Sequence, residues 1–352
     1  MSTEKQTNAS LNKLMKAKAK AMSFNQQALV EIGSLTDGQA LPAVCRPCTD
    51  EVDLINWIKE NQQRIETLLS QRGAILFRGF PIASLTTFER FVNALSPALL
   101  DYSERSTPRS EVKTHIYTST EYPADRSIPL HNEMSYSHNW PMKIWFYCAK
   151  PAQQGGETPI VDSREVYTQL DPKMREQFHQ KKVMYVRNYG EGIDLPWQEA
   201  FQTTERETVE HYCRSAGIRV EWKRDGGLRT QQVRDAVLAH PQTGELLWFN
   251  QVQLFHISTL EPGVRASLLE VFGEENLPRN VYYGDGTSIE DSVVEAIREV
   301  YQQLTVRFPW QEGDILMLDN MLVAHGRAPF TGPRQVLVAM ADLFTGTIYP
   351  DL

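Results

Sequence analysis

The segment GDILMLDNMLVAHGRAPFTGPRQVLVAM, residues 313–340, places two apolar runs on either side of a more polar stretch. The first run, 314–320, and the last, 335–343, are rich in aliphatic residues over lengths typical of buried strands. Glycine and proline between them indicate a loop. The segment therefore predicts a buried strand, a histidine (His325) at its end, a loop, and a return strand carrying Arg334.

The rest of the chain adds short strands and several helices. Runs rich in β-branched and aromatic residues predict strands at 72–80, 142–150, 157–162, 182–190, 218–223 and 246–250. Helices are predicted at 50–71, 86–96, 171–181, 204–215, 229–238, 264–273 and 288–305. Irregular strand spacing and the lack of a glycine-rich phosphate turn argue against a doubly wound sheet. We therefore expect a mainly β fold with helices (α+β), in which a jelly-roll core carries outer helices.

The chain shows no internal repeat and no linker rich in glycine or serine. We expect an N-terminal extension at 1–48 and a single jelly-roll domain at 49–352. Residues of about 191–245 are polar and include predicted helices. We expect this segment to be an insertion that covers an active site as a lid.

Composition narrows the class of protein. The chain has 352 residues, a formal net charge of -8 and 41% hydrophobic residues. The acidic balance argues against nucleic acid or an anionic membrane as the main partner. No apolar run is long enough to span a bilayer, and the first residues lack the apolar stretch of a secretory signal. We expect a soluble cytoplasmic protein, and the sequence leaves its oligomeric state open.

Four cysteines include one C-x2-C pair, Cys45 and Cys48. A structural zinc site would need a second pair at matching spacing, which the sequence lacks. A redox pair would stand between a strand and a helix, whereas this pair lies in a proline-rich stretch. We expect no metal or redox role here.

A histidine and a glutamate stand two apart in PLHNEMSYS, residues 129–137. About one such pair is expected by chance in this composition, so the pair alone is weak evidence. In an extended segment, however, residues i and i+2 point to the same side, so His131 and Glu133 can bind one ion together. With His325 as a third ligand they would leave three positions open on an octahedral ion, which is typical of non-heme Fe(II) oxygenases. A structural zinc site would use four ligands.

The open positions would need a cosubstrate, and two further residues indicate its chemistry. Arg334, on the strand after His325, can bind a carboxylate with two hydrogen bonds. Thr158, in GGET (155–158), can donate a third from its hydroxyl. A dicarboxylate held this way could chelate iron through a 2-oxo acid group at its other end, which describes 2-oxoglutarate.

Six motifs in this sequence resemble the taurine dioxygenase (TauD/TfdA) family of Fe(II)/2-oxoglutarate oxygenases. They are RGAILFRGFPI (72–82), IPLHNEMSYS (128–137), QQGGETPIVDSREV (153–166), HPQTGELLWFNQ (240–251), YGDGTSIED (283–291) and PWQEGDILMLDNMLVAHGRAPFTGPRQVLVAMAD (309–342). They run in the family's order, and the chain is most similar to the branch of clavaminate-synthase-like and syringomycin-type amino-acid hydroxylases. The resemblance implies a double-stranded β-helix (jelly roll, cupin-like).

The resemblance also implies the cofactors and their ligands. The cofactors would be Fe(II), 2-oxoglutarate and O2, with His131, Glu133 and His325 on the iron and with Arg334 and Thr158 on the distal carboxylate of 2-oxoglutarate. Many family members have aspartate where Glu133 stands, and glutamate is familiar in the amino-acid hydroxylase branch. A carboxylate here argues against halogenation, because halogenating relatives carry a small residue at this position. If Arg334 is not the anchor, the other arginine nearby is Arg327.

The substrate implied is an amino acid or an amino-acid-like molecule, free or tethered to a peptidyl carrier protein. Its carboxylate and amine would need a cation and an acceptor, for which Arg327 and Glu121 are candidates. Further candidates for the pocket lie near the metal motif or in the NQ pair before residue 252: Asn132, Ser135, Trp140, Asn250 and Gln251. An aromatic residue at such a position can equally belong to the core.

Three functions fit these residues. The first is hydroxylation of an unactivated C–H bond in natural-product biosynthesis. The second keeps the iron site and catalyses desaturation, epoxidation or cyclisation, which depends on how the substrate is placed. The third is a non-catalytic binding or sensor protein, which the presence of all three ligands and the arginine disfavours.

Overall fold

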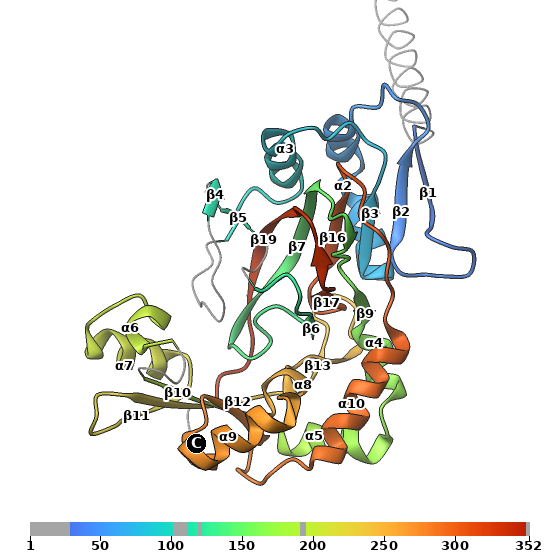
Figure 1. Ribbon diagram of the computed structural model, residues 1–352. Helices are drawn as coiled ribbons and strands as arrows, with labels where there is room; N and C mark the ends of the chain where they lie inside the picture. Colours follow the sequence, from blue (N-terminus) through green and yellow to red (C-terminus); the bar gives the residue numbers. More distant parts are fainter. Residues whose placement is uncertain (1–28, 101–110, 114, 119–121, 191–194, 350–352) are drawn as a thin grey trace, which may run out of the picture.

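The computed structural model describes residues 29–100, 111–113, 115–118, 122–190 and 195–349. Its largest element is an eight-stranded sheet, in the upper half of Figure 1. In sheet order its strands are β1 (Val30–Ser34), β2 (Ala43–Pro47), β3 (Ala74–Phe77), β16 (Ile315–Asp319), β7 (Asn139–Lys150), β19 (Gln335–Thr345), β5 (Ile116–Thr118) and β4 (Glu111–Lys113). The two apolar runs around His325 are therefore confirmed as strands, β16 and β19, and they lie on either side of β7.

A smaller sheet faces the large one. It has three strands in the order β6 (Ile128–His131), β17 (Val323–Arg327) and β9 (Ile160–Asp162). Leu316 and Leu318 of β16 share an apolar cluster with Ile160 and Val323 of the small sheet. Because side chains alternate along a strand, this face of β16 and the small sheet enclose the core of a β sandwich.

Two helices cover the opposite face of the large sheet (Figure 1). Helices α2 (Leu54–Arg72) and α3 (Leu85–Leu95) share a second apolar cluster with Ile315 and Met317, the alternate residues of β16. α2 ends at Gly73, which has φ 73°. A Cβ at Gly73 would lie 2.6 Å from Val323 Cγ2, so the turn from α2 into β3 requires glycine.

The lower half of the molecule holds the remaining helices and a sheet that projects to one side (Figure 1). The sheet has the order β11 (Ile218–Trp222), β12 (Leu228–Arg234), β10 (Val183–Tyr189) and β15 (Arg279–Tyr283). Two-stranded pairs are β13 (Val237–Ala239) with β14 (Leu246–Trp248), and β18 (Phe330–Thr331) with β8 (Gln154–Gly155). The helices are α4 (Ser163–Gln169), α5 (Pro172–Lys181), α6 (Trp197–Ala200), α7 (Arg206–Ser215), α8 (Val252–Phe255), α9 (Pro262–Phe272) and α10 (Asp291–Leu304), with short 3-10 turns at Ile257–Thr259 and Glu274–Asn276. In the described part of the chain, no helix has the length and apolar character needed to cross a membrane.

The prediction of a helix at 229–238 is wrong. The chain forms β12 there, followed by β13. β12 lies between two other strands, and its Thr230 pairs with Arg187 of β10 and with Val220 of β11. A strand between two neighbours has most of its backbone N–H and C=O groups matched, and this long-range pairing outweighs the moderate helix propensity of a stretch rich in glutamine and arginine.

The segment predicted as an N-terminal extension contributes to the large sheet. β1 and β2 form one end of it, and β2 runs parallel to β3. The boundary at residue 48, like the lid role of 191–245, stays a prediction. The described part of that insertion includes α6, α7, β11 and β12.

Candidate metal centre and cosubstrate site

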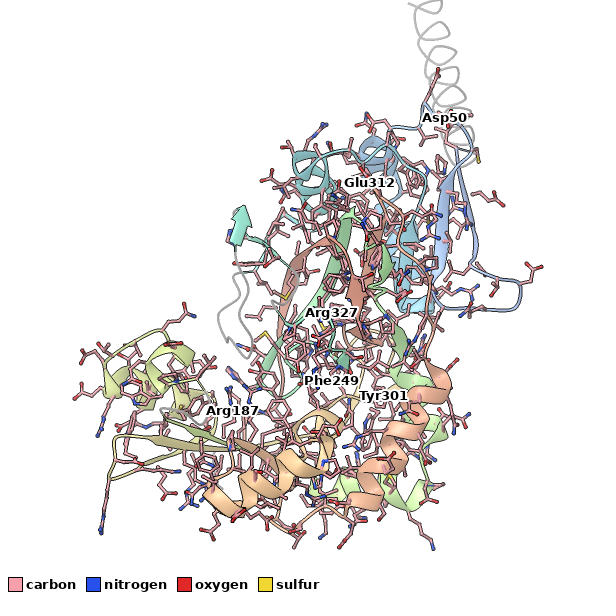
Figure 2. The ribbon with its side chains drawn as sticks, viewed as in Figure 1. Asp50, Arg187, Phe249, Tyr301, Glu312 and Arg327 are labelled. Carbon is pink, nitrogen blue, oxygen red and sulfur yellow. The ribbon has the colours of Figure 1, made fainter. Side chains whose placement is uncertain are left out.

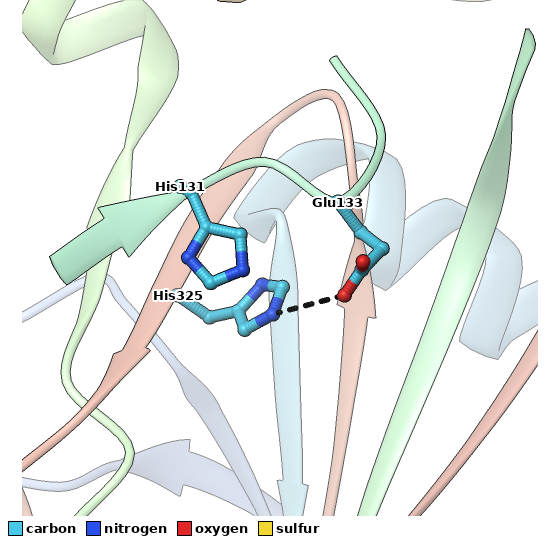
Figure 3. A group of neighbouring side chains, drawn as sticks. All are labelled: His131, Glu133 and His325. Atoms are coloured by element: carbon cyan, nitrogen blue, oxygen red, sulfur yellow. Dashed lines mark ion pairs between the residues drawn. The ribbon is translucent and has the colours of Figure 1, made fainter. Parts of the chain in front are cut away.

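Two neighbouring strands of the small sheet bring the two predicted histidine ligands together. β6 and β17 run antiparallel, and their register sets His131 opposite His325, with ring centroids 4.6 Å apart. Glu133 follows β6 by two residues, and its Oε2 lies 3.9 Å from His325 Nε2 (Figure 3). Each of the three residues offers one donor atom, and the three donors lie within 4.8 Å of one another.

Hydrogen bonding sets the tautomer of His131. Its Nδ1 lies 2.8 Å from the carbonyl oxygen of Pro129. A carbonyl oxygen only accepts, so Nδ1 carries the hydrogen and the Nε2 lone pair is available to a metal. A metal-binding histidine usually donates its other ring N–H in this way, which fixes the orientation of the ring.

The donor set fits an Fe(II) ion. It consists of two imidazole nitrogens and one carboxylate oxygen, and it is the one cluster of three or more potential ligands found among the described residues. Glu133 and His325 are buried, and His131 is half-buried. Three ligands leave coordination positions open, as in non-heme Fe(II) oxygenases, whereas a structural zinc site is closed by four.

Thr158 has a hydroxyl with one fixed partner. The residue is buried, and its Oγ1 accepts a hydrogen bond of 3.2 Å from Trp310 Nε1. Because the indole N–H can only donate, the hydroxyl hydrogen of Thr158 is directed elsewhere and can serve an anionic oxygen. Trp310 is a residue that the sequence reasoning missed.

Arg334 lies beside the GGET segment that contains Thr158. Its Nε donates a hydrogen bond of 2.8 Å to the carbonyl oxygen of Gly156. A Cβ at Gly156 would lie 2.9 Å from Arg334 Cδ, so only glycine leaves room for the arginine side chain. Burial, and then the positive charge of Arg327, lower the pKa of Arg334 to about 10. The guanidinium remains charged at neutral pH, in surroundings that favour an anion beside it.

Comparison with known proteins now decides the family. The family model described as "Taurine catabolism dioxygenase TauD, TfdA family" matches residues 40–340. The chain belongs to the TauD/TfdA family. Enzymes of this family are oxygenases that use Fe(II), 2-oxoglutarate and O2, and this chain is therefore an enzyme with those cofactors.

Two curated relatives and one solved structure illustrate the match. The chain is 46% identical over 286 residues to the dapdiamide synthesis protein DdaC of Enterobacter agglomerans. The aligned region covers 81% of this chain and 86% of the relative. It is 31% identical over 294 residues to a clavaminate synthase-like protein of Arabidopsis thaliana, with 80% and 86% covered. The crystal structure of PvcB from Pseudomonas aeruginosa superposes with a TM-score of 0.54 at 14% identity, over 88% of this chain and 90% of that one. This last similarity concerns the fold alone, and with the family match it confirms the expected jelly-roll class.

Arg327, the residue that we predicted to bind a substrate carboxylate, is engaged with the backbone in this TauD-family chain. It is the last residue of β17 and is buried (Figure 2), and its Nη1 donates to the carbonyl oxygen of Tyr122 at 2.9 Å. Its Nη2 donates to the carbonyl oxygens of Pro123 and Arg126 at 2.6 and 2.7 Å. Arg327 thereby attaches the segment that leads into β6 to the strand that carries His325. A role on substrate stays a prediction.

The other predicted substrate residues also make mostly backbone contacts. Gln251 Nε2 donates to the carbonyl oxygen of Asn132, and Ser135 Oγ donates to the same oxygen. Asn250 Nδ2 donates to the carbonyl oxygen of Ala236. The contacts of Gln251 and Ser135 hold the loop around Glu133 through Asn132. Any contact of these residues with substrate stays a prediction.

Two predicted substrate residues remain, Trp140 and Glu121. Trp140 is buried in the core, where its ring lies 4.9 Å from that of Phe249 and 5.3 Å from that of Phe344. Glu121 lies outside the described residues.

The C-x2-C pair is separated by the fold. Cys45 is buried in β2, whereas Cys48 is exposed, and both are free thiols. Burial raises the pKa of Cys45 to about 12. A thiol held in its neutral form is a poor metal ligand and a poor nucleophile.

Proposed function

We propose that this TauD-family enzyme hydroxylates an unactivated C–H bond of an amino acid or an amino-acid-derived substrate. In this proposal His131, Glu133 and His325 bind Fe(II), and Arg334 and Thr158 hold the distal carboxylate of 2-oxoglutarate. The observation that carries it is the convergence of the three donor groups on the small sheet, where no fourth ligand joins them among the described residues.

The side chains would divide the work as follows. The bound Fe(II) and 2-oxoglutarate supply, with O2, the oxidising chemistry that the protein itself lacks. The three ligands lie on or next to strands of the sheet, which keeps the open coordination face in one orientation. Arg334 would neutralise the far carboxylate of the cosubstrate, and Thr158 would donate to it. The apolar cluster beside the small sheet, which includes Phe146 against the His325 ring, would exclude water from the metal.

The substrate class is supported by similarity. The 46% identical relative is named for dapdiamide synthesis, which supports a role in natural-product biosynthesis and a small-molecule substrate. Such a substrate could be free or tethered to a carrier protein. Hydroxylation is the outcome we propose, and desaturation, epoxidation or cyclisation would be distinguished by the product.

Anaerobic titration with Fe(II) and then 2-oxoglutarate tests the metal site. We expect a metal-to-ligand charge-transfer band that His325→Ala abolishes, because two ligands hold iron poorly. Arg334→Met should weaken 2-oxoglutarate binding by about 2 kcal/mol, close to thirtyfold, while Fe(II) still binds. The matched control is His179→Ala, since His179 is exposed on α5. No band in the wild type, or a full band in His325→Ala, would contradict the iron site.

Turnover tests the substrate class. The iron-loaded enzyme would be exposed to O2 with a panel of amino acids, each free and attached to a carrier protein, and succinate would be measured. We expect succinate to rise above the uncoupled background with at least one amino-acid-derived compound, whose product gains one oxygen atom. A product that has lost two hydrogen atoms would identify desaturation, and no response to any amino-acid-derived compound would contradict the proposed class.

A further inference from the structure

We propose that Asn320 is a positioning residue for the metal site, because it fixes the backbone of Glu133 and thereby sets the reach of the ligand carboxylate. The inference rests on the proposed function, since it takes Glu133 as a metal ligand. It assigns a role to a side chain that lies in the turn between β16 and β17 and contacts neither metal nor substrate in the proposal.

The amide of Asn320 holds Glu133 at both of its backbone polar groups. Oδ1 of Asn320 accepts a hydrogen bond of 2.7 Å from the Glu133 N–H. Nδ2 donates to the Glu133 carbonyl oxygen at 2.9 Å and to the Pro141 carbonyl oxygen at 2.9 Å. Asn320 is fully buried, so no water competes for these bonds. The Asn320 side chain thus satisfies both the N–H and the carbonyl oxygen of Glu133, as a neighbouring strand in a sheet would.

The backbone of Asn320 is held in turn. Its N–H donates to the Met142 carbonyl oxygen at 2.8 Å. Its carbonyl oxygen accepts a bond of 2.6 Å from Nδ2 of Asn132, the residue between the two proposed ligands. Asn320 also precedes His325 by only five residues, on the turn that leads into β17. The position of Glu133 is therefore set relative to the strand that carries His325.

The neighbouring residue shows that the loop is constrained. Met134 has φ 58°, a left-handed conformation that costs a residue with a side chain about 1 kcal/mol. Such a conformation persists where surrounding contacts hold it. Met134 is itself buried, and its carbonyl oxygen accepts from the Ser137 N–H at 2.8 Å. The loop cannot slide toward the metal site without giving up these contacts.

Because the backbone of Glu133 is held in place, only the length of its side chain determines how far the carboxylate extends toward the metal site. The Glu133 carboxylate lies 3.9 Å from His325 Nε2, as two ligands of one ion can. Aspartate at this position would be shorter by one carbon–carbon bond, about 1.5 Å, and the clamped backbone could not advance to compensate. Asn320 therefore makes glutamate, rather than aspartate, the residue that fits position 133. A side chain that only stabilised the fold would have no such link to the length of residue 133.

The chain offers a matched control. Asn188 in β10 is also almost fully buried, and its Nδ2 donates to the backbone carbonyl oxygens of Leu277 and Glu275 at 2.7 and 3.2 Å. Truncating Asn188 removes the same chemical group from a similar environment. The Asn188 substitution leaves the surroundings of His131, Glu133 and His325 unchanged. It therefore shows how a loss of stability alone affects metal binding.

The test is a double-mutant cycle on the affinity for Co(II), an inert stand-in for Fe(II), measured anaerobically without 2-oxoglutarate. We expect Asn320→Ala to weaken Co(II) binding by 10- to 100-fold, the range for residues that orient metal ligands. Glu133→Asp should cost at least tenfold in the wild type and less than threefold in the Asn320→Ala background, because the released backbone can then move forward. Asn188→Ala should change the affinity by less than twofold and leave the cost of Glu133→Asp unaltered.

Distinct results separate the two proposals. If Asn320→Ala binds Co(II) within twofold of the wild type, or if Glu133→Asp costs the same in both backgrounds, the role of Asn320 is overturned while the metal site stands. If His325→Ala binds Co(II) as the wild type does, the metal site itself is wrong, and the inference falls with it. Should Asn320→Ala fail to fold, the isosteric Asn320→Asp replaces it: it keeps the acceptor but loses both donations, and the same comparison applies.

Discussion

The contact with Trp310 sets the direction in which the Thr158 hydroxyl can donate a hydrogen bond. Its oxygen accepts from Trp310 Nε1, and this contact turns its hydrogen away from the indole. The residue type alone predicted a hydroxyl that can donate to a carboxylate. It could not predict the partner, because nothing in the local sequence around Thr158 indicates an indole that approaches from residue 310.

Removal of the indole N–H is expected to weaken the cosubstrate site selectively. Trp310→Phe keeps an aromatic ring in the core but frees the Thr158 hydroxyl to rotate. We expect the Kd for 2-oxoglutarate to rise about fivefold, near 1 kcal/mol, while Co(II) affinity is unchanged. Calorimetric titration of the metal-loaded enzyme measures both. In a Thr158→Val background the same change should have no further effect, and an undiminished effect there would contradict the link.

Cysteine reactivity is expected to follow burial. Burial raises the pKa of Cys45 and of Cys148 to about 12, so at pH 8 only about one thiol in ten thousand is ionised. Cys48 is exposed, and we expect iodoacetamide at pH 8 to modify it first. Because the pKa values of Cys45 and Cys148 are raised, the thiolate fraction of each should increase about tenfold for each pH unit up to pH 12.

Peptide mass spectrometry of the folded protein, with a urea-unfolded sample as control, measures the order of labelling. All four cysteines should react once the chain is unfolded. Early labelling of Cys45 together with Cys48 would mean that the start of the large sheet opens readily.

Among the helices and strands, some are set by the local spacing of apolar residues and others by pairing with distant strands. Helices such as α2 and α10 follow from apolar spacing, which is a local property of the chain. β12 does not, because its glutamine- and arginine-rich sequence is compatible with a helix and becomes a strand only between β10 and β11. The same holds for the contact between β17 and the segment before β6, which Arg327 makes through three carbonyl oxygens.

Loss of the Arg327 guanidinium is expected to release that segment. Arg327→Met keeps the apolar part of the side chain and removes three charged hydrogen bonds, each contributing about 1 kcal/mol or more. We expect the backbone amides of residues 122–127 to exchange with deuterium at least tenfold faster, as followed by mass spectrometry. Arg265→Met is the control, because Arg265 pairs with Asp291 on the surface. Unchanged exchange in Arg327→Met would mean that other contacts hold the segment.

At the scale of the whole molecule, one buried ion pair joins distant parts of the chain. Arg78, just after β3, contacts Asp314, the residue before β16, at 2.6 Å, and it also donates to the carbonyl oxygen of Pro309. The Asp314 side chain is fully buried and that of Arg78 is 11% exposed. Pro309 precedes Trp310, so this pair also supports the residue that orients Thr158.

Breaking this pair is expected to destabilise the protein strongly. Arg78→Met leaves the Asp314 carboxylate buried without its cation, which typically costs about 3–5 kcal/mol. Urea unfolding measures the free energy of unfolding for this variant. The same change at half-buried Arg265, whose partner Asp291 is exposed, should cost no more than about 1 kcal/mol. Equal losses in the two variants would show that burial does not govern the contribution of the Arg78 pair.

Residue types and their spacing predicted the strands around His325, most of the helices, and the three candidate ligands of an iron site. These are local properties: periodicity, turn residues, and two side chains that point the same way at i and i+2. Four features became visible only in the folded chain: His131 lies opposite His325, β12 is a strand, Arg327 binds backbone, and Asn320 holds the backbone of Glu133. The physical reason is that hydrogen-bond direction and strand register depend on partners far away in the chain, which the residue type does not reveal.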